Sequence, residues 1–199
     1  MIYGVGIGPG DPELLTLKAL RILRDVDRVV VPGELAGKVL KGLVDFEVVE
    51  FPMGRFPMGR SEEVARNLAK ELVEFDGDVA FACLGDPTFY STFQHVYEEM
   101  VRLDPKAEVS IVPGVPSFTA VLSKLKLFID FPVLITTPKK DRYEGVLVLK
   151  ASRPKEVCDW LRSLGFERIR LARRVFMKDE EIIDCDAGYD YFTVAVGLR

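Results

Sequence analysis

The sequence predicts an α/β protein with two lobes: a mainly parallel sheet in the N-terminal lobe, a mixed sheet in the C-terminal lobe, and a cleft between them. In residues 1–113, apolar runs of strand length alternate with segments of helical periodicity, as in parallel βαβ units. After about Lys126, strand-like runs follow one another with few helices, which favours a largely antiparallel sheet. The stiff Pro-Gly-Val-Pro segment at 113–116 lies between these patterns, so we expect domains at 1–113 and 114–199.

Residues 1–32 form the first predicted unit of strand, turn, helix and strand. Glycines alternate from Gly4 to Gly10 around Pro9, so the backbone can adopt positive φ and come close to a ligand. Asp11 or Thr16 could cap the helix that follows. The apolar face of this helix is expected to hold Leu15, Ala19, Ile22, Leu23 and Val26.

These glycines fit the dinucleotide-binding fingerprint poorly. That fingerprint needs glycines at the first, third and sixth positions of one window, but Asp11 stands at the sixth position after Gly6 and Gly8. The second strand also ends at Pro32 without the acidic residue that would bind a ribose. The sequence therefore disfavours NAD binding, and a tight structural turn is the simpler alternative.

Two further turns follow strands of the same predicted sheet. Gly85-Asp86-Pro87 follows the apolar strand 78–84, and Ser117, a potential helix cap, follows strand 108–112. Open parallel sheets bind ligands at the carboxyl ends of their strands, so we expect these turns and the glycine loop to meet at one crevice. Asp86 could accept hydrogen bonds from a ligand there, or it could cap the helix expected at 89–103.

Residues 51–60 are a tandem repeat, FPMGRFPMGR, in which prolines and glycines exclude regular structure. One interpretation is a loop whose aromatic residues tuck into the core. The other is an amphipathic lid in which Arg55 and Arg60 face a flat anionic ligand. A helix is expected from Ser61 to about Phe75.

The C-terminal lobe is predicted from shorter patterns. Its expected elements are strands at 132–137, 145–150, 168–177, 180–184 and 191–198, and a helix at 154–164.

Composition and charge narrow the function classes. The chain has 199 residues and a formal net charge of −4, which argues against a nucleic-acid binder. It shows no apolar run of about 20 residues and no signal peptide, so we expect no membrane span and a cytoplasmic location. Cys83, Cys158 and Cys185 form no CxxC pair, which suggests a reduced compartment and neither disulfides nor zinc. His95 is the only histidine, and we expect a surface or packing role for it and no bound metal.

Three segments resemble the tetrapyrrole (corrin and porphyrin) methyltransferases: GVGIGPGDPELLTLKALRIL, LGDPTFYSTF and VPGVPSFTAV. The second and third look most like the branch that methylates C20 of precorrin-2 or cobalt-factor II in cobalamin (vitamin B12) synthesis. The resemblance implies two α/β domains that bind S-adenosylmethionine between them, usually as a homodimer. The cofactor-binding residues that it implies are Pro9, Gly85, Asp86, Phe89, Pro116, Ser117, Lys150 and Thr193.

The implied reaction moves a methyl group from a sulfonium to an electron-rich carbon of the tetrapyrrole. The protein then has mainly to align donor and acceptor, which explains why no catalytic acid or base can be named from the sequence. Arg55 and Arg60 are the expected contacts to the substrate carboxylates, and Lys139, Lys140 and Arg142 are further basic candidates. Three alternatives stay open: a diphthine synthase-like methyltransferase, a nucleotide-dependent oxidoreductase, and a cofactor-binding module without turnover.

Overall fold

The chain forms two compact units, Met1–Asp130 and Phe131–Arg199. The structure is a computed structural model that describes residues 1–51, 58–133, 135, 143–177 and 179–199, with the backbone alone at 58–60. The domain boundary expected at residues 113 and 114 stays a prediction.

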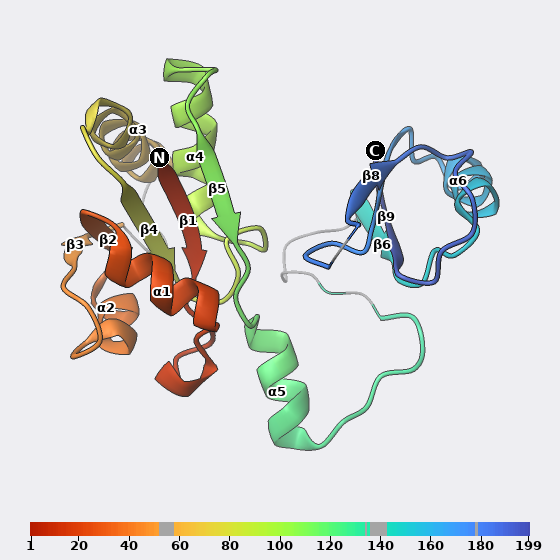
Figure 1. Ribbon diagram of the computed structural model, residues 1–199, viewed down its shortest axis with the longest axis horizontal. Coiled ribbons are helices and arrows are strands. Elements are labelled where there is room, and N and C mark those ends of the chain that lie inside the picture. Colours follow the sequence, from red (N-terminus) through yellow and green to blue (C-terminus); the bar gives the residue numbers. More distant parts are fainter. Residues whose placement is uncertain (52–57, 134, 136–142, 178) are drawn as a thin grey trace. The chain divides into compact units, whose positions relative to one another are not determined.

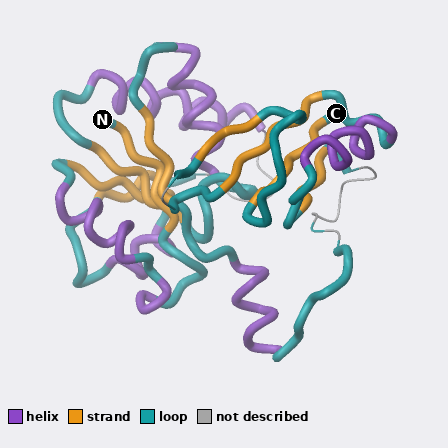
Figure 2. The backbone as a smooth tube through the Cα atoms, turned by 45° about the vertical axis from the view of Figure 1, so that its right-hand side comes forward, coloured by secondary structure: helices purple, strands orange, loops and turns teal. Residues whose placement is uncertain are grey.

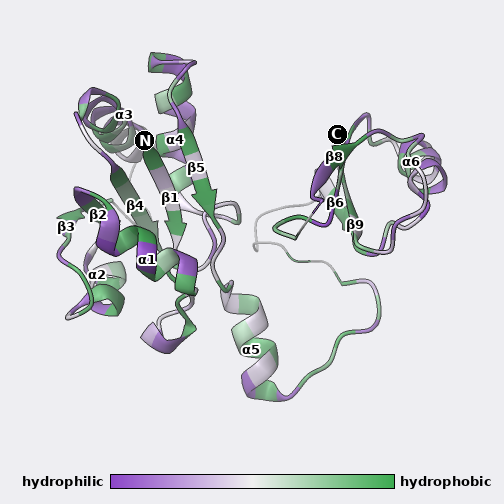
Figure 3. Ribbon diagram, viewed as in Figure 1, coloured by the Kyte–Doolittle hydropathy of each residue, from purple (hydrophilic) through white to green (hydrophobic). Residues whose placement is uncertain are grey.

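The first unit contains a five-stranded parallel sheet in the order β3-β2-β4-β1-β5. Its strands are β1 (Ile2–Gly6), β2 (Arg28–Pro32), β3 (Glu47–Val49), β4 (Val79–Cys83) and β5 (Val109–Val112). Its helices are η1 (Pro12–Leu14), α1 (Leu17–Asp25), α2 (Glu34–Leu40), α3 (Met58–Glu74), α4 (Thr92–Leu103) and α5 (Ser117–Leu125). The central strands read as hydrophobic runs (Figure 3), as parallel strands with both faces covered do.

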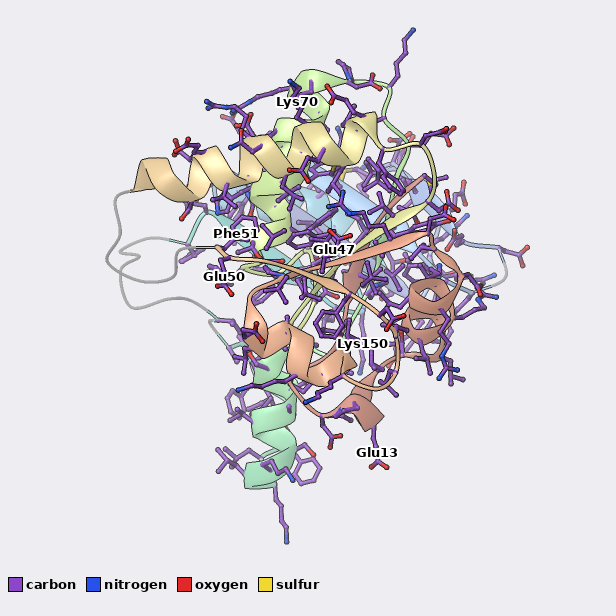
Figure 4. All side chains as sticks on the ribbon, turned by 90° about the vertical axis from the view of Figure 1, so that its left-hand side faces the viewer. Glu13, Glu47, Glu50, Phe51, Lys70 and Lys150 are labelled. Carbon is purple, nitrogen blue, oxygen red and sulfur yellow. A yellow bond between two sulfur atoms is a disulfide. The ribbon has the colours of Figure 1, made fainter. Side chains whose placement is uncertain are left out.

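Helices cover both faces of this sheet (Figures 1 and 2). On one face α1 and α2 bury Leu23 and Val39 against Val5 and Val31. On the other face α3 and α4 enclose a separate cluster around Phe81, which contacts the Phe51 ring edge-on at 6.1 Å. Figure 4 shows Lys70 on the outer, solvent side of α3. The predicted apolar helix face is confirmed, since Ala19 and Leu23 belong to the first cluster and the other three residues are partly buried against it.

The helix starts agree with the sequence in part. Both proposed caps occur: Asp11 Oδ1 accepts from the Glu13 amide in η1, and Thr16 Oγ1 accepts from the Ala19 amide at 3.1 Å in α1. Pro116, and not Ser117, occupies the cap position of α5, so that assignment was wrong by one residue. Helix α3 starts at Met58, earlier than the predicted Ser61.

The second unit packs one helix against a four-stranded antiparallel sheet in the order β6-β9-β7-β8. Its elements are β6 (Gly145–Val148), α6 (Pro154–Ser163), β7 (Arg168–Arg173), β8 (Glu181–Ile183) and β9 (Thr193–Leu198). Leu161 and Phe166 fill the core against Leu171 and Ala195. All its described strand pairs are antiparallel, and part of the strand expected at 132–137 lies outside the described residues.

The cysteine prediction was wrong for two of the three residues. Cys158 of α6 and Cys185, which follows β8, form a disulfide across 27 residues of sequence. Cysteines scattered along the sequence can still meet once α6 packs on the sheet, which the absence of a CxxC motif does not exclude. These two residues therefore give no support for a reduced compartment. Cys83 is free and buried in β4, as expected.

The described helices include none with the length and apolar character needed to cross a membrane. The described residues also contain no cluster of three or more histidine, cysteine or acidic side chains suited to holding a metal ion.

Candidate functional site

The loops after β1 and β4 lead to opposite faces of the parallel sheet. β1 and β4 are neighbours that pair in parallel from Ile2 to Gly6, yet β1 continues into α1 on one face and β4 into α4 on the other. The two loops therefore part at the carboxyl end of this strand pair. In open α/β sheets such a switch point is where ligands bind.

Gly6 and Gly114 let the turns after β1, β4 and β5 approach one another without intervening side chains. A Cβ on Gly6 would lie 2.5 Å from the Gly114 amide nitrogen and 2.6 Å from the Gly85 carbonyl oxygen. A Cβ on Gly114 would overlap the same carbonyl oxygen of Gly85. No other residue fits at these positions, so glycine is what brings the three turns together.

The glycine-rich loop and the Gly-Asp-Pro turn are also hydrogen-bonded to each other. The Gly85 amide donates to the Gly8 carbonyl oxygen at 2.7 Å, and the Gly8 amide donates to the Gly85 carbonyl oxygen at 3.4 Å. Both residues have positive φ, 75° for Gly8 and 71° for Gly85, which glycine adopts without steric cost. This pairing fixes Pro9 next to the Gly-Asp-Pro turn.

Asp86 braces two of the turns. Its Oδ1 accepts from the Thr88 amide at 2.8 Å and from Thr88 Oγ1 at 2.6 Å. Its Oδ2 accepts from the amide of Gly114 at 3.0 Å, across 28 residues of sequence. Both carboxylate oxygens are thus used within the protein. Asp86 shapes the site by holding the β4 and β5 turns together, a role that sequence reasoning offered only as a ligand contact or a cap.

A shallow hollow of about 410 Å³ opens between Pro9 and one face of α5. Its other lining residues are Ser117, Ala120, Val121, Lys124 and Leu125. Phe118 at the start of α5 contacts the Phe89 ring at 5.3 Å, which joins α5 to the turn that follows β4. Pro116 lies beside Gly85, since a Cβ on Gly85 would be 3.9 Å from the Pro116 Cα.

The expected site residues of the first unit are therefore brought together. Pro9, Gly85, Asp86, Phe89, Pro116 and Ser117 all lie at the carboxyl ends of β1, β4 and β5. Sequence reasoning missed Gly114, Thr88 and Phe118. The PGVPSF segment contained the signal for two of them, but a contact between segments that are distant in sequence is visible only in the fold.

Lys150 and Thr193 lie together in the second unit. The Ala151 amide donates to the Thr193 carbonyl oxygen at 2.9 Å. The Thr193 hydroxyl is fully buried and donates to the Asp190 carbonyl oxygen at 2.8 Å, so it is already used within the protein. Lys150 Nζ lies 5.5 Å from the centre of the Tyr191 ring, and a hydrogen bond to Tyr191 raises the pKa of this exposed lysine.

Several expected contacts lie elsewhere or outside the described residues. Arg55 belongs to the segment 52–57, and the Arg60 side chain likewise lies outside what the structure describes. The same holds for the basic candidates at 139, 140 and 142. His95 is exposed, in a charged groove of about 260 Å³ between α3 and α4 that holds none of the expected site residues.

Comparison with known proteins shows which family this chain resembles. The family model of the Tetrapyrrole (Corrin/Porphyrin) Methylases matches residues 1–188. The chain belongs to this family. The "Probable cobalt-precorrin-2 C(20)-methyltransferase" of Methanocaldococcus jannaschii is 30% identical over 222 residues, which cover 100% of this chain and 96% of that protein. The "Cobalt-precorrin-4 C(11)-methyltransferase" of the same organism is 29% identical over 140 residues, 68% of this chain and 52% of that protein.

Two solved structures share the fold. The methyltransferase CobJ aligns with a TM-score of 0.55 at 16% identity. This alignment covers 100% of this chain and 93% of the CobJ chain. The cobalt precorrin-4 methyltransferase CbiF aligns with a TM-score of 0.50 at 21% identity. This alignment covers 98% of this chain and 93% of the CbiF chain. At these identities the likeness shows the two-lobed α/β fold alone.

S-adenosylmethionine is the methyl donor of this family, and the residues present fit it. The donor carries a sulfonium cation, a carboxylate and an adenosine, so it needs main-chain hydrogen-bonding groups and an apolar surface more than it needs a charged cluster. A methyl group placed on Gly10 would meet no atom within 4 Å, so the glycine-rich loop is open at that residue. The hollow at Pro9 is also lined by Ser117 and by apolar residues of α5.

Proposed function

We propose that this protein transfers a methyl group to C20 of precorrin-2, or of its cobalt-containing form cobalt-factor II, in cobalamin biosynthesis. The observation that carries the proposal is the similarity to the Methanocaldococcus jannaschii protein, which extends over the whole of this chain and nearly the whole of that one. The other relative from that organism, named for C11 methylation, spans only 68% of this chain. The proposal therefore prefers C20 to C11.

The bound donor supplies a methyl group that is already electrophilic because it is attached to a sulfonium. The protein has to hold this group in line with the accepting carbon, and orientation of that kind accounts for several kcal/mol of a barrier. We assign the holding role to the turns at Pro9, Gly85, Phe89, Pro116 and Ser117, whose backbones converge at the end of the sheet.

The remaining assignments come from the second unit and from the segment at 52–60. Lys150 and Thr193 would contribute to the cofactor site, although the buried Thr193 hydroxyl already donates to the Asp190 carbonyl oxygen. Arg55 and Arg60 would grip the substrate carboxylates, since arginine binds carboxylates in a bidentate manner. We also propose that the enzyme acts as a homodimer, which light scattering of the purified protein would test.

The deciding experiment compares two tetrapyrroles side by side. The protein is incubated anaerobically with S-adenosylmethionine and either precorrin-2 or cobalt-factor II, and the product is analysed by mass spectrometry and NMR. We expect one methyl group to be added, at C20, and the faster substrate shows whether cobalt precedes methylation. Methylation at another carbon would refute the C20 assignment and leave the family intact.

Three other outcomes would overturn the proposal as a whole. Methyl transfer to a diphthamide precursor on a translation factor, with none to a tetrapyrrole, would make the protein a diphthine synthase. Tighter binding of NAD than of S-adenosylmethionine would indicate an oxidoreductase. Saturable binding of S-adenosylmethionine without transfer to any tetrapyrrole would indicate a binding module.

A further inference from the structure

Tyr90 has an unusual backbone conformation next to the candidate site. It lies between the Gly-Asp-Pro turn and α4 with a φ of 51°, in the left-handed region that residues with a Cβ rarely adopt. Within the described part of Met1–Asp130, Lys126 is the other non-glycine residue with positive φ. Lys126 ends α5, where a left-handed residue is common, whereas Tyr90 precedes a helix.

The residues on both sides of Tyr90 hold this conformation in place. Before it, Thr88 donates twice to Asp86. After it, Ser91 Oγ accepts from the Phe93 amide at 3.1 Å, capping α4, and donates to the buried Cys83 sulfur. A strained residue persists only where its surroundings fix it, and such residues gather at ligand sites.

The fold makes little use of the Tyr90 side chain. It is 60% exposed, and the Tyr90 hydroxyl has no hydrogen bond among the described residues. Its ring contact is to Phe89, edge-on at 5.0 Å, and Phe89 in turn contacts Phe118 at 5.3 Å. Phe89 and Phe118 are half-buried, so they form a fixed support behind an exposed ring.

We propose that Tyr90, supported by Phe89 and Phe118, is a contact for the flat conjugated face of the tetrapyrrole and helps to select a planar macrocycle. This inference rests on the proposed function. Tyr90 has a backbone conformation that glycine would adopt with less strain. A large aromatic side chain at such a position indicates a role other than stabilising the fold. An exposed ring on a rigid support suits a broad planar ligand, because such a ligand brings its own apolar area to the contact.

The test compares four variants by two measurements. Tyr90→Phe keeps the ring, Tyr90→Leu keeps the bulk and the strain without a ring, and Tyr90→Gly removes both side chain and strain. Tyr97→Leu, which removes another exposed aromatic residue of the same region, is the matched control. The measurements are the KM for the tetrapyrrole, supported by its Kd from quenching of tetrapyrrole fluorescence, and the Kd for S-adenosylmethionine by calorimetry.

We expect the leucine and glycine variants to raise the tetrapyrrole KM and Kd about tenfold, the scale of one aromatic stacking contact. The phenylalanine variant and the Tyr97 control should stay within about twofold of the wild type, and no variant should change the affinity for S-adenosylmethionine. Tyr90→Gly should also melt at the same or a higher temperature, since it relieves strain.

Two results would overturn the inference while the proposed function stands. One is normal tetrapyrrole affinity in Tyr90→Leu and Tyr90→Gly. The other is loss of S-adenosylmethionine affinity in these variants with tetrapyrrole affinity intact, which would assign the ring to the adenine. A wild-type protein that neither binds nor methylates a tetrapyrrole would refute the proposed function and this inference together.

Discussion

Removal of the Asp86 carboxylate should separate two turns of the proposed cofactor site. In Asp86→Ala the Gly114 amide loses the partner that lies 3.0 Å away, and Thr88 loses both of its bonds to Oδ1. Thr88 is exposed, so water can replace its partner at small cost. The bond to Gly114 is partly buried and joins turns that are distant in sequence, so its loss should dominate.

The size of the effect follows from the kind of bond lost. A hydrogen bond to a charged group contributes about 1.5–3 kcal/mol, and an unsatisfied buried amide costs a similar amount. We therefore expect Asp86→Ala to lower the free energy of unfolding by about 2 kcal/mol. If binding must restore the order of the two turns, the Kd for S-adenosylmethionine should rise about thirtyfold.

Two control variants show whether Asp86 acts by holding the two turns together or by contacting the ligand directly. Thr88→Val removes one exposed donor and keeps the bond to Gly114, so it should leave cofactor affinity nearly unchanged. Asp86→Asn has one acceptor oxygen in place of two and can serve only one turn, so it should fall between wild type and alanine. Calorimetry gives the Kd values, and the rate of hydrogen exchange at the Gly114 amide shows whether its hydrogen bond to Asp86 is present.

Unchanged S-adenosylmethionine affinity in Asp86→Ala would refute this reasoning. So would a large loss of affinity in a variant whose Gly114 amide still exchanges as slowly as in the wild type, because Asp86 would then act on the ligand directly.

Three further predictions concern other parts of the chain. Gly114→Ala should destabilise the protein by about 3 kcal/mol, since the methyl group overlaps backbone; Gly188→Ala, with open space around it, is the control in urea melts. Reducing the Cys158–Cys185 disulfide with a dithiol should lower the free energy of unfolding by about 3.5 kcal/mol, because the bond closes a loop of 27 residues. The stability of a variant with alanine at both positions should not change when the reductant is added. Burial raises the pKa of the Cys83 thiol from 9.0 to about 11. The thiol therefore ionises at lower pH in the unfolded chain than in the folded protein, and the free energy of unfolding should fall by about 3 kcal/mol between these pH values. Cys83→Ala should lack that fall, and an equal fall in both proteins would contradict the assignment of the effect to Cys83.

Local sequence signals predicted the elements, because each depends on neighbours along the chain. Ala19 and Leu23 recur at helical spacing and are buried in α1. The convergence of turns was predictable too, since parallel strands place their carboxyl ends at one edge of the sheet. The bond from Asp86 to Gly114 was not, because it depends on which strands become neighbours in space.

Other features escaped prediction for similar physical reasons. The disulfide joins α6 to the residue Cys185 that follows β8, a contact that no spacing between Cys158 and Cys185 reveals. The left-handed backbone of Tyr90 runs against its own conformational preference and is imposed by the turns around it.

The most direct test of the account is a crystal structure of the protein with S-adenosylhomocysteine, the product form of the donor. The account predicts that the bound molecule contacts Gly8, Pro9, Gly85 and Ser117 at the carboxyl ends of β1, β4 and β5. A molecule bound elsewhere, for example in the charged groove beside His95, would contradict it.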